Sequence, residues 1–167
     1  AGAVDVTTHF PARRQLAKGI KYKYVVEGLL GGHSGSDIHL ERANAGSIAA
    51  RMLLEAREAV QLNILSIAGG RATNVILGKV AGEVIVAASD AKAFEESIAA
   101  TTAAVKEEYR TSDPGIRVAV EAVGETEEEA IDTACQDNFL KFVLACPAGA
   151  QHYSVELENL VETSHSI

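Results

Sequence analysis

The stretch GLLGGHSGSDIH, residues 28–39, joins a strand-like run at residues 22–30 to a helix-like run that begins near residue 44. Its glycines let the backbone reach positive φ and let another chain segment or a ligand approach closely. A histidine held in such a turn, His33, can donate a hydrogen bond to an oxygen at near-neutral pH. An isolated His-Ser-Gly triplet is more simply explained as a polar turn, so its interpretation depends on the surrounding sequence.

The segments around this turn predict an α+β, ferredoxin-like βαββαβ fold, in which an antiparallel sheet carries both helices on one face. Strands are indicated by β-branched, aromatic or alternating residues, and helices by apolar residues at helical spacing. Asn44 is placed to cap the first helix. Within a core at residues 21–124, strands are predicted at 22–30, 62–68, 80–88 and 116–123, and helices at 44–60 and 90–109.

The two ends of the chain are predicted separately from this core. Residues 1–20 show no clear period, and the polar part of this segment, 9–19, is expected to be a loop. In the extension at 125–167, Thr126 and Glu129 fit a capping box, so a helix is expected from there to about residue 145. The glutamates of its first turn are explained by the helix dipole rather than by a cation site. One more strand is expected at 153–163.

Composition limits the class of protein. The chain has 167 residues, 47% of them hydrophobic, and a formal net charge of −8. The acidic balance argues against nucleic acid or an anionic membrane as a partner, and no stretch has the length of a transmembrane span. Cys135 and Cys146 lie in a helix-like run, about 16 Å apart at the helical rise. They are therefore expected to be reduced, in a cytoplasmic protein.

The same turn contains three residue types that bind zinc in proteins. His33, Asp37 and His39 would point to one side of an extended chain and could hold a zinc ion. The glycines Gly31, Gly32 and Gly35 argue against a regular strand there. A catalytic zinc also needs a further strong ligand and supporting groups. The residues alone therefore predict no metal site and no complete active site.

A second turn, GGRATNVI at residues 69–76, joins two predicted strands through a glycine pair. Asn74 at its tip has two explanations. An asparagine bonds its own backbone well in turns, which is the simpler explanation. Alternatively, its side-chain amide is presented to a ligand.

The chain resembles the aminoacyl-histidine dipeptidases, also called peptidase D or cytosol non-specific dipeptidases, of the di-zinc exopeptidase family. The resemblance rests on the motif at 28–39 followed by Asn44-Ala45, and continues in order along the chain through 70–76, CPAG at 146–149 and LVETS at 160–164. It implies that this chain is the front portion of a lid, often also the dimerisation domain, inserted into a catalytic domain that holds two zinc ions. Residues 1–20 then lead out of that domain, the rest of the lid lies beyond residue 167, and this portion alone is inactive.

The same resemblance implies roles for two residues. His33 aligns with a lid histidine that stabilises the oxyanion of the tetrahedral intermediate, in dimeric members at the site of the other subunit. Asn74 aligns with a position that contacts the dipeptide substrate. The sequence departs from the family where Leu77 replaces a usual proline, and at 86–88, where many relatives carry an arginine near the substrate carboxylate.

Two other classes of function stay open at this point. The chain could be a free-standing ferredoxin-like module that binds a small metabolite at its glycine-rich turn. It could also be a purely structural dimerisation module in which His33 only packs. The fold cannot separate these from the enzyme lid, because it serves many functions.

Overall fold

The computed structural model describes residues 2–167 as one antiparallel sheet covered by helices, with two small two-stranded ladders beside it. Two short 3-10 turns, η1 (Ile38–Leu40) and η2 (Ala88–Asp90), precede α1 and α2. The strands are β1 (Arg14–Glu27), β2 (Gly32–His33), β3 (Leu62–Gly69), β4 (Val75–Ile76), β5 (Val80–Val86), β6 (Arg117–Ile131), β7 (Gly149–Tyr153) and β8 (Val161–His165), and the helices are α1 (Ala45–Ala59), α2 (Ala91–Glu108) and α3 (Thr133–Ala145).

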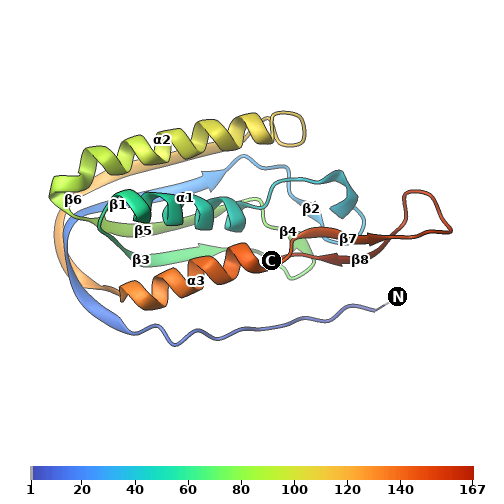
Figure 1. Ribbon diagram of the computed structural model, residues 1–167, viewed down its shortest axis with the longest axis horizontal. Coiled ribbons are helices and arrows are strands. Elements are labelled where there is room, and N and C mark those ends of the chain that lie inside the picture. The colour runs from blue at the N-terminus through green and yellow to red at the C-terminus, as the bar shows by residue number, and fades with distance from the viewer. Residues whose placement is uncertain (1) are drawn as a thin grey trace.

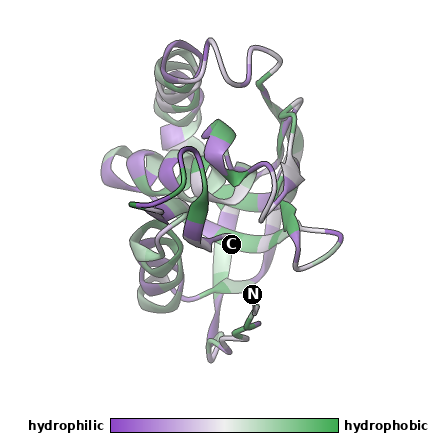
Figure 2. Cartoon of the chain, turned by 90° about the vertical axis from the view of Figure 1, so that its right-hand side faces the viewer, coloured by the Kyte–Doolittle hydropathy of each residue, from purple (hydrophilic) through white to green (hydrophobic). Residues whose placement is uncertain are grey.

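The main sheet has the strand order β3-β5-β1-β6, and all three of its pairings are antiparallel. This is the order of a ferredoxin-like βαββαβ unit, so the predicted fold class is confirmed. Figures 1 and 2 show α2, α1 and α3 side by side on one face of the sheet, with α1 in the middle. The third helix therefore extends the layer that the first two helices form.

The alternating apolar residues of β1 form part of the buried core. Tyr22, Tyr24 and Val26 alternate along β1 and are buried on the face that the helices cover. Tyr22 lies 4.9 Å from Phe94 of α2, measured between ring centroids. The side chain of Asn44 accepts hydrogen bonds from the backbone N–H groups of Gly46 and Ser47, as expected of the predicted cap of α1.

The predictions for residues 9–19 and for the start of the third helix are wrong in part. Residues 14–19 belong to β1, and residues 125–131 belong to β6, because the two segments pair with each other from Arg14↔Ile131 onward. The helix α3 begins only at Thr133, and its cap is Asp132, which accepts a hydrogen bond from the Cys135 backbone. Long-range strand pairing here overrides the local capping signal.

Two of the glutamates expected in a first helical turn, Glu127 and Glu128, instead pair with basic residues across the ladder. Lys18 lies 3.8 Å from Glu127, and Lys21 lies 3.2 Å from Glu128. Hydrogen bonds from Thr126 and Lys21 lower the pKa of Glu128. Cross-strand pairs of opposite charge stabilise antiparallel strands, which explains why this acidic run is a strand.

The single strand predicted at 153–163 is also wrong. The structure has a hairpin, in which β7 and β8 pair and residues 154–160 form the turn between them. The N-terminal segment is anchored on α3, where Phe10 packs edge-on against Phe139 and Phe142. In Figure 1 this segment runs alongside α3.

Candidate functional site

The structure brings the two predicted turns together. The strands β2 and β4 form an antiparallel pair with the register Gly32↔Ile76 and His33↔Val75. The ladder continues where the Ser34 N–H donates to the Asn74 carbonyl at 3.0 Å. His33 and Asn74 are both exposed, at the end of the molecule that also carries the β7–β8 hairpin (Figure 1). No sequence pattern predicts this pairing, because each strand is only two residues long.

The ring of His33 is held by backbone groups of its own turn. Its Nδ1 accepts hydrogen bonds from the N–H groups of Gly35 at 3.0 Å and Ser36 at 3.2 Å. A nitrogen that accepts two hydrogen bonds carries no proton, so this geometry assigns the neutral ring's proton to Nε2. The chemical consequence is an oriented Nε2–H donor on an exposed side chain.

Backbone conformation or close contacts explain why glycine occupies each of three positions in this turn. Gly31 and Gly32 have φ values of +61° and +137°, where other residues are strained. A Cβ on Gly32 would lie 2.5 Å from Arg42 Nη1. A Cβ on Gly35 would lie 3.2 Å from the His33 ring, so the ring needs the space that this glycine leaves.

Asp37 and Arg42 stabilise the turn from inside. The Asp37 carboxylate accepts a hydrogen bond from the His33 N–H at 2.8 Å, and Arg42 donates to the Gly31 carbonyl at 2.6 Å. Asp37 is therefore used by the loop itself, rather than as a ligand beside His33 and His39. Among residues 2–167 there is no group of three or more His, Cys, Asp or Glu side chains placed to hold a metal ion.

The sequence does not indicate the position of Asp113, which lies in the turn between α2 and β6 and anchors the loop that carries His33. This residue is 1% exposed, and its carboxylate accepts hydrogen bonds from the backbone N–H groups of Leu30 and Ala43, each at 2.7 Å. In the sequence, Asp-Pro-Gly at 113–115 indicates only the end of a helix. Nothing local indicates that this side chain turns inward to a loop far along the chain.

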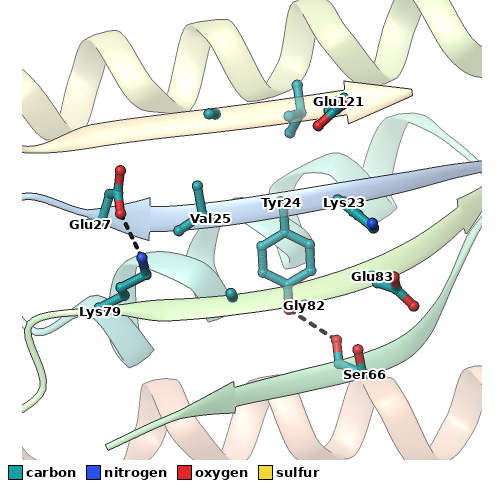
Figure 3. Close-up of a pocket in the computed structure, with 12 residues that line it drawn as sticks. Lys23, Tyr24, Val25, Glu27, Ser66, Lys79, Gly82, Glu83 and Glu121 are labelled. Atoms are coloured by element: carbon teal, nitrogen blue, oxygen red, sulfur yellow. Dashed lines mark hydrogen bonds and ion pairs between the residues drawn. The ribbon is translucent and has the colours of Figure 1, made fainter. Parts of the chain in front are cut away.

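Two hollows on the described part of the chain are lined by residues other than His33 and Asn74. One, of about 660 Å³, lies on the sheet face away from the helices (Figure 3). Lys79 pairs with Glu27 at 2.8 Å in this hollow. Tyr24, whose side chain belongs to the buried core on the helix-covered face, lies across Gly82 and donates to the Ser66 carbonyl at 3.3 Å. Burial raises the pKa of Tyr24 well above its usual range.

The other hollow, of about 650 Å³, lies between η1, the end of α2 and the β7–β8 hairpin. Arg42, Asn44 and His165 are among its lining residues. This hollow is lined by the later part of the loop that carries His33, but the His33 ring is not among its lining residues. The predicted site residues thus form an open surface that encloses no ligand by itself.

No helix of residues 2–167 has the length and apolar character of a membrane span. Both cysteines, Cys135 and Cys146, are free thiols.

Comparison with known proteins identifies relatives of this architecture. Residues 24–113 match the family described as the peptidase dimerisation domain. The whole chain is 25% identical to the cytosol non-specific dipeptidase of Escherichia coli (strain K12), of which it covers 35%.

Solved structures give the same result. The aminoacylhistidine dipeptidase from Vibrio alginolyticus matches 93% of this chain at a TM-score of 0.84 and 30% identity, over 31% of its own length. A hydantoinase/carbamoylase family amidase from Burkholderia ambifaria matches 72% of this chain at a TM-score of 0.53 and 20% identity, which shows the fold alone. The chain therefore spans about a third of the length of the dipeptidases that it matches.

Proposed function

This chain belongs to the peptidase dimerisation domain family, and on that premise we propose that it is the front lid portion of a zinc-dependent dipeptidase that cleaves Xaa-His and other dipeptides. The names of the two dipeptidases that it resembles over 100% and 93% of its length support this substrate class. The name of the first, and the two free cysteines, support a cytoplasmic location for the parent protein.

The observation that carries the proposal is the orientation of His33. Its Nδ1 is occupied by two backbone N–H groups, so its Nε2–H is available to an oxygen outside this chain. A fixed donor aimed at developing negative charge stabilises a tetrahedral intermediate more than it stabilises the bound substrate. The turn paired with it presents Asn74, whose amide is proposed to contact the dipeptide.

The rest of the site is proposed to lie on a catalytic domain of the same protein. His33 and Asn74 are exposed, and Leu30 and Val75 beside them are apolar side chains with 63% and 40% of their surface exposed. Such a surface is suited to closing over another domain and excluding water from the reacting bond.

The residues described here do not fit the two zinc ions of the proposed parent. Asp37 is bonded inside the loop, and the described chain brings no metal-ligand group together. We therefore assign the zinc ligands to the catalytic domain and no step of metal chemistry to this chain. The lid's contribution is to bind, orient and stabilise charge.

We also propose that the parent forms a homodimer through this domain. One edge of the sheet, β3, is closed by the buried side chain of Gln136 from α3, which bonds to Ile64 N–H and to the Leu62 carbonyl at 2.9 Å each. At the other side of the sheet, the outer edge of β6, away from β1, pairs with no further strand among residues 2–167. An unpaired edge of this kind is a ready site for a second copy.

The test is hydrolysis of Ala-His by the full-length gene product, with zinc added or removed by a chelator, and with its mass in solution measured by light scattering. The proposal predicts chelator-sensitive cleavage by a dimer, and no cleavage by residues 1–167 alone. A folded, zinc-loaded full-length protein that leaves Ala-His and other dipeptides intact would contradict it and favour a metabolite-binding module.

A further inference from the structure

The loop that carries His33 is closed by one buried carboxylate. The loop leaves β1 after Glu27 and enters α1 at Ala45. Asp113 bonds to the backbone N–H of Leu30 near its start through Oδ1, and to that of Ala43 near its end through Oδ2, both at 2.7 Å. Hydrogen bonds to a charged acceptor are short and strong, especially when they are buried.

Further contacts of the loop lie between these two anchor points. The Asp37 carboxylate accepts from the His33 N–H and Arg42 donates to the Gly31 carbonyl, and both contacts are internal to the loop, so they move with it if its ends move. The middle of the loop is also tied to neighbouring segments, because the Ser34 N–H donates to the Asn74 carbonyl and the Ser34 carbonyl accepts from Ser164 Oγ at 3.3 Å. Asp113 is the group that joins both ends of the loop to α2. Asp113 itself is held by the end of α2, where its N–H donates to the Tyr109 carbonyl at 2.9 Å.

We propose that Asp113 is a positioning residue: its carboxylate fixes both ends of the His33 loop relative to α2, and so determines where the Nε2–H of His33 points. This inference rests on the proposed role of His33. It assigns no contact with the substrate to Asp113, because its carboxylate is buried and both oxygens bond to the loop.

The test is a double-mutant cycle of Asp113→Asn and His33→Ala in the full-length protein, with zinc-dependent hydrolysis of Ala-His as the measurement. Asn keeps the shape but replaces one acceptor oxygen with an NH2 group, which cannot accept from the loop. The expected result is a loss of roughly 10- to 100-fold in kcat with KM little changed, as for a displaced catalytic group. In the His33→Ala background the same substitution should have little further effect on kcat.

A purely structural role gives a different pattern. Loss of folded protein lowers activity by the same factor in both backgrounds, and that result would overturn the positioning role. Asp90→Asn is the matched control, because Asp90 also accepts a backbone N–H, from Gln61 at 2.9 Å, at the start of α2. It should leave kcat near that of the wild type.

Three further outcomes bear on the positioning role of Asp113. If His33→Ala alone leaves kcat unchanged, the proposed function of His33 fails and the positioning role fails with it. If Asp113→Asn does not fold, Asp113→Glu takes its place in the cycle, since it keeps both acceptors and the charge but shifts them. If neither variant folds, Asp113 serves the fold as a whole, and the specific positioning role is rejected.

Discussion

At the residue scale, the orientation of His33 depends on small neighbours rather than on other functional side chains. Gly35 donates to its Nδ1 and leaves the space that the ring occupies. The sequence predicted that glycines would surround a histidine in a turn. It could not predict which ring nitrogen is free, because that depends on where the two consecutive backbone N–H groups of Gly35 and Ser36 point.

Gly35→Ala tests this dependence. The added Cβ would lie 3.2 Å from the His33 ring, which is tighter than ordinary contact, so the ring must shift. We expect kcat of the full-length enzyme to fall roughly tenfold through misplacement of the donor. The melting temperature should change little, because the position is exposed. An unchanged kcat would show that the ring tolerates the methyl group and that this geometry is not required.

At the scale of elements, local sequence patterns predict helices and strands correctly where tertiary contacts favour the same structure. The helix α1 has both an apolar period and the Asn44 cap, and it was predicted to within one residue at each end. The boundary between β6 and α3 was missed because residues 125–131 carry a capping pattern, yet pair with β1. Pairing across more than a hundred residues of sequence leaves no local trace at either partner.

Gln136 connects α3 to the edge of the sheet, and Gln136→Leu removes that connection. Both backbone groups of β3 that it satisfies would be left buried and unpaired, at about 1–3 kcal/mol each. We expect the free energy of unfolding of this chain, measured in urea, to fall by about 2–5 kcal/mol. The control is Gln151→Leu, an exposed amide that bonds only to the nearby Gly149 carbonyl. Equal stability of the two variants would contradict the edge-closing role.

The charged ladder between β1 and β6 should make stability depend on pH. The pKa of Glu128 is lowered in the folded state by Thr126 and Lys21. Its contribution to stability is therefore present above the ordinary glutamate pKa of 4.5, which applies in the unfolded state, and is lost as pH falls through the lower pKa of the folded state.

Glu128→Gln removes this titration. The free energy of unfolding of the variant should change less between neutral and acidic pH than that of the wild type. Added salt should reduce this difference between the wild type and the variant, because the Glu128 side chain is 42% exposed and its charge is partly screened. If urea unfolding of the two proteins shows the same dependence on pH, the ladder charges do not contribute in this way.

At the scale of the whole molecule, the fold class and the two candidate turns could be predicted, whereas an active site could not be completed. His33 and Asn74 lie together on an exposed surface, and no metal ligands assemble among residues 2–167. The chain covers about a third of each dipeptidase that it resembles. We therefore propose that the reaction takes place where this surface meets another domain, and that the outer edge of β6 is open to a second copy.

The central claim is that the Nε2–H of His33 stabilises a transition state in the full-length dipeptidase. The most direct test compares His33→Ala with His39→Ala, an exposed histidine in the same segment, in steady-state hydrolysis of Ala-His. We expect His33→Ala to lower kcat by roughly 100- to 1,000-fold with little change in KM, and His39→Ala to behave as the wild type. An unchanged kcat, or an effect on KM as large as that on kcat, would contradict it.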